Sequence, residues 1–298
     1  MGSPISIVLT NGEWAAQFGE LPDGVLAFDL DKPLRQVASA GLLHLTQGSV
    51  ETTIDARTPV TFFPFRSPYE PGDHRAAAGA IFGLASLIAT LQNLGVVLRN
   101  DPDSWLRAYD KSALFALAYI VEIPETTLYL GASKIAAPVS GRHLVKSGLG
   151  IRKLHRGGYL EAAMLPPGET VDVPRGQRYA VQRYLPVERE IRSYCIRPTA
   201  GAPDCLSFDM PVGTAETPDW RDALDDAQFH VSSSSDPIVD SITRRIRERL
   251  NLDYVCVDIV VSSARHYLVD VNPHGSWAWL PEHPRRQVSD MVTTYLRT

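Results

Sequence analysis

Three oxygen-bearing side chains near the C-terminal end have a spacing that suits a divalent cation. Asp258 lies in one apolar, strand-like run, and Asp270 and Asn272 lie in the next, across a turn at 263–266. Residues two apart on a strand point to the same face, so Asp270 and Asn272 share a face, and a hairpin would bring Asp258 opposite them. Mg²⁺ binds few protein oxygens and keeps positions for phosphates. The pattern therefore predicts a magnesium site on one face of a hairpin, although two acids facing solvent would also explain it.

Two lysines upstream favour the metal interpretation over the solvent-facing one. Lys111 is predicted at the start of a helix and Lys146 at the end of a strand. Either lysine alone is typical of a protein surface. Facing a magnesium–phosphate site, both would neutralise the charge of a nucleotide. The sequence contains no P-loop and no GxGxxG, so the nucleotide would be held in another way.

The elements that must position these residues alternate between strands and helices. In the first hundred residues, apolar β-branched runs predict strands, and an alanine-rich stretch predicts a helix. These strands are expected at Ile5–Thr10, Val25–Phe28, Leu42–Leu45, Val50–Ile54, Val60–Phe65 and Val96–Leu98, and the helix at His74–Leu94. Together they predict a small α/β domain.

The remaining two hundred residues predict further strands and three helices. Helices are expected at Ser104–Val121, Asp236–Leu250 and Arg285–Leu296. Strands are expected at Thr126–Leu130, His143–Lys146, Tyr179–Leu185, Ile191–Ile196, Tyr254–Ser262 and Tyr267–Val271. The glycine-rich, basic stretch 147–158 predicts a loop.

Composition limits the class of protein. The chain has 298 residues, of which 44% are hydrophobic and 21% charged, as in ordinary soluble proteins of one large domain or two to three small ones. The net charge of −5 argues against recruitment of nucleic acid or of an anionic membrane. No apolar run is long enough for a transmembrane helix, and no signal peptide is evident, so a cytoplasmic enzyme is expected. Cys195, Cys205 and Cys256 form no CxxC pair, which argues against a disulfide framework and a structural zinc site.

The set of acids, amide and lysines resembles the ATP-grasp superfamily of carboxylate–amine ligases. The resemblance is firm from Asn100 to the C-terminus and looser before it. It implies an α/β (α+β) ATP-grasp fold, in which two α+β subdomains hold the nucleotide after a small α/β N-terminal domain. The domains expected are 1–100 for the N-terminal domain, 101–184 for the central subdomain with the loop 147–158 as its lid, and 185–298 for the C-terminal subdomain with the metal site.

The resemblance also assigns roles to individual residues. Asp258, Asp270 and Asn272 match the family's metal ligands for Mg²⁺ or Mn²⁺, and Lys111 and Lys146 match the two lysines that bind ATP phosphates. The matching nucleotide-binding positions are Gln182 at the adenine amino group, the backbone of Arg183 and Leu185 at the ring edge, and Glu190 at the ribose hydroxyls. The arginines expected to bind substrate are Arg192, at the carboxylate and acyl phosphate, and Arg221 and Arg66 in the substrate pocket.

Within the superfamily, the chain looks most like the ring-closing enzymes, namely the microviridin-type peptide maturases and D-cycloserine synthetase. The stretch 271–280, VNPHGSWAWL, is the most specific shared feature. The resemblance implies an ADP-forming ligase that activates a carboxylate as an acyl phosphate and captures it with an amine, aminooxy or hydroxyl group. Because the region between Lys146 and Gln182 is short for a surface that docks a leader peptide, an amino-acid-like small molecule is the preferred substrate, cyclised in antibiotic or specialised-metabolite biosynthesis.

Two alternatives remain open from the sequence. A short precursor peptide with side-chain ester or amide cross-links would place the chain among the ribosomal-peptide maturases. A phosphotransferase would stop at the phosphorylated product. Homodimers are common in the superfamily, and a homodimer is the oligomer that the resemblance implies.

Overall fold

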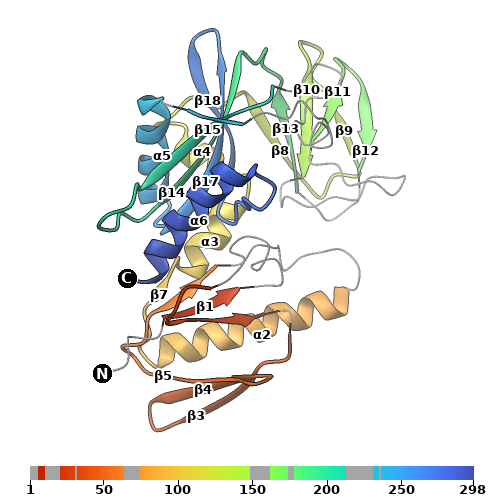
Figure 1. Cartoon of the computed structure of the whole chain (residues 1–298). Helices are drawn as coiled ribbons and strands as arrows, with labels where there is room; N and C mark the ends of the chain where they lie inside the picture. The colour runs from red at the N-terminus through yellow and green to blue at the C-terminus, as the bar shows by residue number, and fades with distance from the viewer. Residues whose placement is uncertain are drawn as a thin grey trace.

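The computed structural model describes residues 6–10, 21–30, 32–63, 74–147, 162–173, 178–212, 231–234 and 236–298. Figure 1 shows the N-terminal elements at the bottom, a large sheet with its helices above them, and a smaller sheet beside the large one. Arg66, Arg221 and nearly all of the expected lid loop lie outside the described residues.

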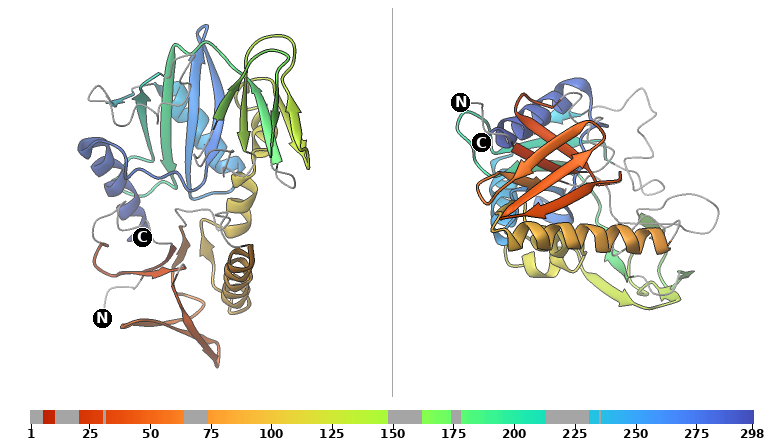
Figure 2. Two further views of the ribbon diagram at one scale, coloured as in Figure 1. Left: turned by 90° about the vertical axis from the view of Figure 1, so that its right-hand side faces the viewer. Right: turned by 90° about the horizontal axis from the view of Figure 1, so that it is seen from below.

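The N-terminal part consists of a parallel sheet, one long helix and a three-stranded antiparallel sheet. The parallel sheet has the order β2-β1-β6-β7. Its strands are β1 (Ser6–Thr10), β2 (Val25–Asp29), β6 (Val60–Phe62) and β7 (Leu98–Arg99). The other elements are β3 (Arg35–Ser39), β4 (Leu42–Gln47), β5 (Val50–Ile54) and α2 (His74–Asn93). Leu45 and Ile54 share one core with Leu9 of β1 and Leu91 of α2, so the three layers pack together (Figure 2, right).

The smaller sheet is antiparallel, with the order β11-β10-β13-β8. Its strands are β8 (Thr126–Leu130), β10 (His143–Ser147), β11 (Ala162–Leu165) and β13 (Arg178–Arg183), and a pair β9 (Lys134–Ala136) and β12 (Thr170–Asp172) lies beside them. Val145 and Val181 pair directly and belong to this sheet's own core with Ile135. Because partners in an antiparallel sheet face the same side, Lys146 and Gln182 lie together on the opposite face.

The large C-terminal sheet has the order β16-β15-β14-β17-β18 and is sandwiched between helices. Its strands are β14 (Arg189–Ile196), β15 (Cys205–Met210), β16 (Ser232–Ser233), β17 (Tyr254–Ser262) and β18 (Arg265–Asn272). The helices are α3 (Pro102–Tyr109), α4 (Ala113–Leu117), α5 (Pro237–Arg249) and α6 (Glu282–Leu296).

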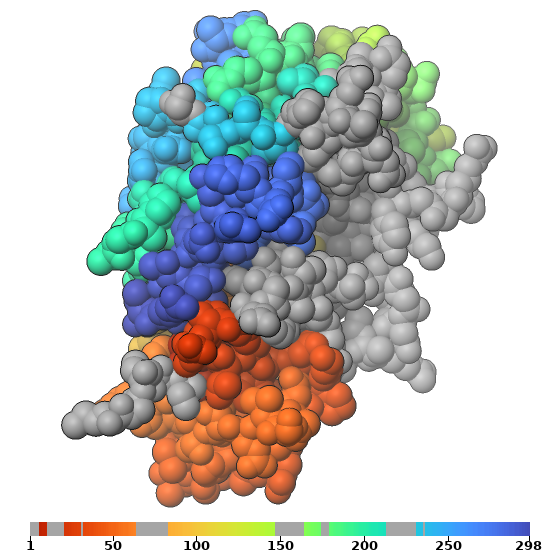
Figure 3. Space-filling view, viewed as in Figure 1, coloured from red at the N-terminus to blue at the C-terminus, as the bar shows by residue number. Residues whose placement is uncertain are grey.

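Strand β17 shows how the two faces of the large sheet differ. Val255 and Val257 belong to the core that contains α3, α4 and α5, whereas Tyr254 and Cys256 belong to the core formed with α6. Asp258 follows the second alternation, so it points to the α6 side. In the space-filling view, α6 covers this side next to the N-terminal strands (Figure 3).

Asn100 joins the N-terminal part to the large sheet. Its backbone N–H donates to Asp253 Oδ2 at 2.9 Å, and its side-chain Nδ2 donates to the carbonyl of Phe62 at 3.0 Å. Its Oδ1 accepts from the N–H groups of Asp253 and Tyr254, both at 3.3 Å. Tyr295 of α6 donates to the same Asp253 carboxylate at 2.7 Å. One asparagine, 1% exposed and with φ of 54°, therefore ties together β6, the start of β17 and, through Asp253, α6.

The structure corrects three sequence-based expectations. The expected helix at Ser104–Val121 is wrong as a single helix, because the chain breaks between α3 and α4. The break occurs where the Asp110 carboxylate accepts the N–H of Ser112 at 2.8 Å. The strands that were not predicted are β3, β9, β11, β12, β15 and β16.

The third correction concerns the cysteines. Cys195 and Cys205 lie directly opposite on β14 and β15 and form a disulfide. The sequence argued against a disulfide framework and gave no sign of this single disulfide, because strand pairing brings together two cysteines whose sequence spacing carried no signal. Cys256 is free and fully buried, as an apolar strand residue would be.

None of the described helices is both long enough and apolar enough to cross a membrane.

Candidate active site

The register of three neighbouring strands sets the centre of the site. Arg192 on β14 pairs with Asp258 on β17, and Asp258 pairs with Asp270 on β18. The hairpin predicted from the sequence is present, with Asp258 and Asp270 directly opposite. Since directly paired residues share a face, one cation and two acids form a row across the sheet.

A second cation lies at the end of this row. Lys111, in the break between α3 and α4, forms an ion pair through its Nζ with Asp270 Oδ1. Only 9% of the Lys111 side chain and 17% of the Asp270 side chain are exposed. The helix break thus places a lysine 159 residues away in sequence against the predicted metal ligand.

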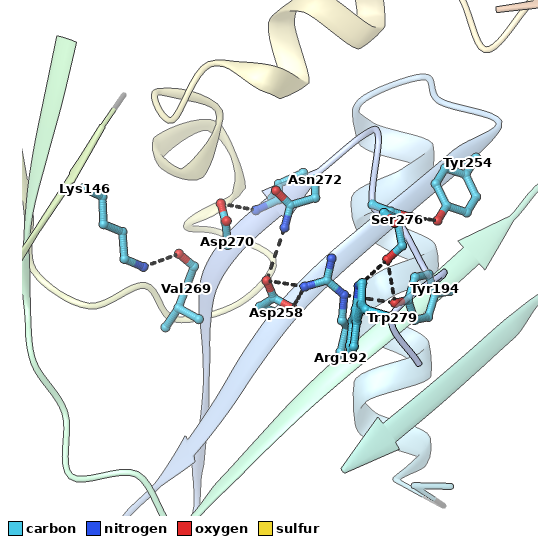
Figure 4. Close-up of polar contacts among 12 residues, drawn as sticks. Lys146, Arg192, Tyr194, Tyr254, Asp258, Val269, Asp270, Asn272, Ser276 and Trp279 are labelled. Atoms are coloured by element: carbon cyan, nitrogen blue, oxygen red, sulfur yellow. Dashed lines mark hydrogen bonds and ion pairs between the residues drawn. The ribbon is translucent and has the colours of Figure 1, made fainter. Parts of the chain in front are cut away.

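Asn272 lies on the same face, next to the row. Its Nδ2 donates to Asp258 Oδ2 at 3.2 Å (Figure 4). Asn272 pairs in register with Cys256, which is two residues before Asp258 on β17. The three predicted metal ligands are therefore brought together by one hairpin.

Arg192 is held on three sides. Its Nη1 donates to both oxygens of Asp258, at 3.1 and 3.3 Å, and its Nε donates to the Tyr194 hydroxyl at 3.1 Å. Its guanidinium also lies over the ring of Trp279, 5.3 Å from the ring centre. Burial opposes the charge on Arg192, but Asp258, Cys256 and Tyr194 together outweigh it and raise the pKa of Arg192 well above its ordinary value.

A backbone carbonyl anchors the two aromatic partners of Arg192. Ser276 O accepts from the Tyr194 hydroxyl at 3.2 Å and from Trp279 Nε1 at 2.9 Å (Figure 4). The sequence analysis assigned no site role to Tyr194 or to Trp279. The signal that could have found Tyr194 was its period-two spacing from Arg192 on one strand.

The smaller sheet contributes Lys146, which reaches across to the large sheet. Its Nζ donates to Gln182 Oε1 at 2.9 Å and to the Val269 carbonyl of β18 at 3.2 Å. Burial lowers the pKa of Lys146 below its ordinary value, and the carboxylate of Asp270 works against that effect. Lys146 and Lys111 thus approach Asp270 from different elements, so a polyphosphate placed there would meet two cations.

The positions expected to read the nucleobase lie at the end of β13. Gln182 is 2% exposed, and its Nε2 donates to Thr126 Oγ1 at 3.2 Å while its Oε1 accepts from Lys146. The N–H of Arg183 donates to the carbonyl of Glu125 at 2.8 Å. In this arrangement the Gln182 amide orients Lys146. To bind an adenine amino group, Gln182 would have to give up its hydrogen bond to Lys146 or to Thr126.

Of the four remaining predicted residues, two lie at or near the start of β14 and two lie outside the described residues. Glu190 is half-buried on β14, on the same strand face as Arg192, and close enough to act on the charge of Lys146. Leu185 is half-buried just after β13. Arg66 and Arg221 fall outside the described residues, so their place in the site stays a prediction.

His274 lies beside the metal ligands but is packed against aromatic rings. Its ring centre is 5.0 Å from that of Tyr109 and 5.9 Å from that of Trp105. Burial lowers the pKa of His274 to about 4, and nearby Lys111 adds to the effect. The ring is therefore neutral at pH 7, which fits a structural role better than that of a charged substrate ligand.

The residues fit a magnesium ion by their donor atoms. Asp258, Asp270 and Asn272 offer only oxygen ligands once the Asn272 amide turns its Oδ1 inward, and hard cations prefer oxygen. Both acids are already paired with cations, Arg192 and Lys111. A metal ion would therefore enter most easily together with phosphates that draw the lysines away.

The fold and this site define the class of protein: the chain has the ATP-grasp fold. A RiPP-associated ATP-grasp ligase from Chryseobacterium gregarium, solved with ADP and a leader and core peptide, matches with a TM-score of 0.67 and 15% identity, covering 98% of this chain and 96% of that one. The macrocyclase MdnC from Microcystis aeruginosa, bound to the precursor peptide MdnA, matches with a TM-score of 0.65 and 12% identity over 98% and 99% of the two chains.

A third similar structure is that of a synthetase and not of a peptide-associated enzyme. D-alanyl-alanine synthetase A from Vibrio cholerae matches with a TM-score of 0.58 and 11% identity, covering 99% of this chain and 98% of that one. No family model matches the sequence. No curated protein matches it either.

Proposed function

We propose that this protein is an ATP-dependent ligase that activates a carboxylate of a peptide substrate and joins it to a hydroxyl or amine of the same peptide. The observation that carries the proposal is the row Arg192–Asp258–Asp270–Lys111, which combines two oxygen ligands for a metal with two cations for a phosphate and a carboxylate. The ATP-grasp fold supports it, because the row lies where the large sheet faces the smaller one.

A peptide substrate is favoured over the amino-acid-like small molecule expected from the sequence. The two structures with TM-scores of 0.67 and 0.65 were solved with precursor or leader and core peptides, and the D-alanyl-alanine synthetase has the lower score of 0.58. The short central region that favoured a small molecule is compatible with similarity over 98% of this chain to both peptide-associated enzymes.

The reaction would proceed in two balanced steps. A substrate carboxylate oxygen attacks the γ-phosphorus of ATP, the bond to the β-phosphate oxygen breaks, and ADP leaves. A hydroxyl or amine then attacks the acyl carbon and loses its proton, and inorganic phosphate leaves. Each cross-link makes the peptide lighter by one water.

The chain's own residues supply binding and charge for these steps. Lys111 and Lys146 would hold the phosphates, and Glu190 the ribose, while the strand end at Arg183 and Leu185 would line the base. Bound Mg²⁺ would supply charge neutralisation along the polyphosphate. Arg192 would present its guanidinium to the substrate carboxylate and to the acyl phosphate formed from it, since its planar fork suits both.

The test is release of ADP and phosphate with Mg·ATP across a panel of peptides, with product masses measured in parallel. The peptides pair Asp or Glu with Ser, Thr or Lys, and free amino-acid derivatives form a second set. We expect equal amounts of ADP and phosphate, and a peptide lighter by one water for each turnover. Phosphate retained on the product would make the protein a phosphotransferase, and turnover of the amino-acid derivatives alone would restore the small-molecule substrate.

A matched pair of variants links turnover to the site. Asp270→Asn should abolish product formation. Asp209→Asn replaces an acid on the same sheet that pairs with Arg189 at 2.8 Å, away from the row, and should retain activity. Equal loss in both variants would show that the assay follows stability and not the site.

A further inference from the structure

Asp258 is paired with a buried cation of the protein itself, Arg192. Only 6% of the Arg192 side chain and 7% of the Asp258 side chain are exposed, and Nη1 of Arg192 contacts both carboxylate oxygens. A buried acid that loses its partner is left as an uncompensated charge, so a free divalent cation would have to break this pair to use Asp258 as a ligand.

Arg192 is also prevented from turning away. Tyr194 accepts from its Nε, and Trp279 covers one face of its guanidinium. Both aromatic side chains are fixed on the same acceptor, Ser276 O, in the turn that follows β18. Within the described residues, no hydrogen bond is formed by Nη2 of Arg192, so one edge of the fork stays available as a donor (Figure 4).

We propose that Arg192 is the resident counter-ion of Asp258, and that Tyr194 and Trp279 are positioning residues that keep it there. The site then rejects free divalent cations and accepts one only together with the polyphosphate of a nucleotide, which offers the metal further oxygen ligands. With Asp258 engaged by a metal ion, Nη1 of Arg192 would become available to a substrate carboxylate while Tyr194 and Trp279 still hold the guanidinium in place. This inference rests on the proposed function for the identity of Asp258 as a metal ligand.

The test measures binding of free Mn²⁺ without nucleotide, from the electron paramagnetic resonance signal of unbound Mn²⁺. Arg192→Met should bind Mn²⁺ at least about tenfold more tightly than the unmodified protein, because removal of a cation beside the ligand removes both its competition and its repulsion. Asp258→Asn reports binding elsewhere on the surface and is subtracted. If Arg192 only supported the fold, its loss would weaken Mn²⁺ binding, and that result would overturn the proposal.

A milder and matched pair of variants covers the case in which Arg192→Met does not fold. Tyr194→Phe removes the hydroxyl that Arg192 contacts, and should tighten Mn²⁺ binding by about threefold, in line with one lost hydrogen bond. Tyr254→Phe removes a buried hydroxyl that donates to the neighbouring carbonyl, Gly275 O, without touching Arg192. It should leave Mn²⁺ affinity unchanged, and an equal effect in both variants would refute the positioning role.

A parallel titration with ADP present separates this inference from the proposed function. If Mn²⁺ with ADP binds and Asp258→Asn weakens that binding, the metal site stands, and an unchanged free-Mn²⁺ affinity in Arg192→Met would then refute the counter-ion role alone. If neither Mn²⁺ nor Mn²⁺ with ADP binds at Asp258, the metal assignment fails, and the counter-ion role fails with it.

Discussion

Gly275 occupies the tightest backbone approach in the turn that supports Arg192, and its replacement by alanine should be costly. A Cβ at position 275 would lie 2.1 Å from Cys256 Cβ and 2.8 Å from Cys256 Sγ. A change of rotamer could move Sγ, but it cannot relieve the closer contact, because that one involves a Cβ fixed to strand β17. The turn would have to move away from the sheet.

Overpacking of a well-packed core costs about 1–3 kcal/mol, and a clash between two Cβ atoms belongs at the upper end of that range. We therefore expect Gly275→Ala to lower the stability by about 3 kcal/mol, which for a chain of this size corresponds to a drop in Tm of about 6 °C. Because the moved turn carries Ser276 O, the same variant should loosen Tyr194 and Trp279 and weaken the hold on Arg192.

A double-mutant cycle identifies the cause of the loss. Cys256→Gly removes the Cβ that Gly275→Ala would meet, so the double variant should be more stable than the sum of the two single changes by about 2 kcal/mol. Cys256→Ala keeps that Cβ and removes only the sulfur, so it should rescue much less. A loss below about 1 kcal/mol in Gly275→Ala, or equal rescue by glycine and alanine at position 256, would refute the packing argument.

Three other predictions concern Asp270 in the row, Asn100 between the N-terminal part and the large sheet, and the response to acid. Asp270→Ala should eliminate substrate-dependent ADP release and, because it leaves the buried Lys111 ammonium without its partner, lower Tm by several degrees; ADP release that persists in an assay well below that Tm would refute the role of Asp270. Asn100→Ala should lower the free energy of unfolding by about 3 kcal/mol, measured by heat or urea, because it leaves buried hydrogen-bond donors and acceptors unpaired at a residue with a positive φ. Asn100→Gly should cost nearly as much if the lost hydrogen bonds, and not the positive φ, dominate. Arg244 donates to Asp204 at 2.6 and 2.9 Å and lowers the pKa of that carboxyl, so the pair stabilises the fold above the ordinary pKa of aspartate and loses its effect as the pH falls further. Arg244→Met should accordingly move the midpoint of acid unfolding, followed by circular dichroism, to a higher pH.

The hairpin at the centre of the site could be predicted from local sequence alone. Period-two spacing on two apolar strands separated by a short turn leaves few registers, and one of them places Asp258 opposite Asp270, as observed. The ATP-grasp fold was also predictable from the resemblance, since the acids, the asparagine and the two lysines occur in the family's order.

The contacts between distant segments could not be predicted in the same way. Ser104–Val121 has helical composition throughout, and only the structure shows that it breaks at Lys111, which pairs with Asp270 from the far end of the chain. Helix propensity is a weak preference that such a tertiary contact overrides. The pairing of Cys195 with Cys205 depends on a hairpin whose second strand, β15, was not predicted at all.

The contact between Arg192 and Asp258 could not be predicted from the sequence either, so only part of the role of Arg192 was predictable. Arg192 was predicted to bind a substrate carboxylate, but the carboxylate that it contacts in the protein is Asp258. Strands β14 and β17 are neighbours in the sheet although 57 residues separate Ile196, the end of β14, from Tyr254, the start of β17. Sheet order of this kind is set by long-range packing of two cores and not by any local pattern.

The order of charges across the sheet limits when the site can act. In the row Arg192–Asp258–Asp270–Lys111, two positive groups flank two adjacent negative ones, so the charges of the row cancel. A free metal ion would add uncompensated positive charge to this row, and a free polyphosphate would add negative charge beside two acids. Only a metal ion together with a polyphosphate brings charges of both signs, which the acids and the cations can each accept, so the register of the three strands supports the proposed use of a metal–nucleotide complex over either component alone.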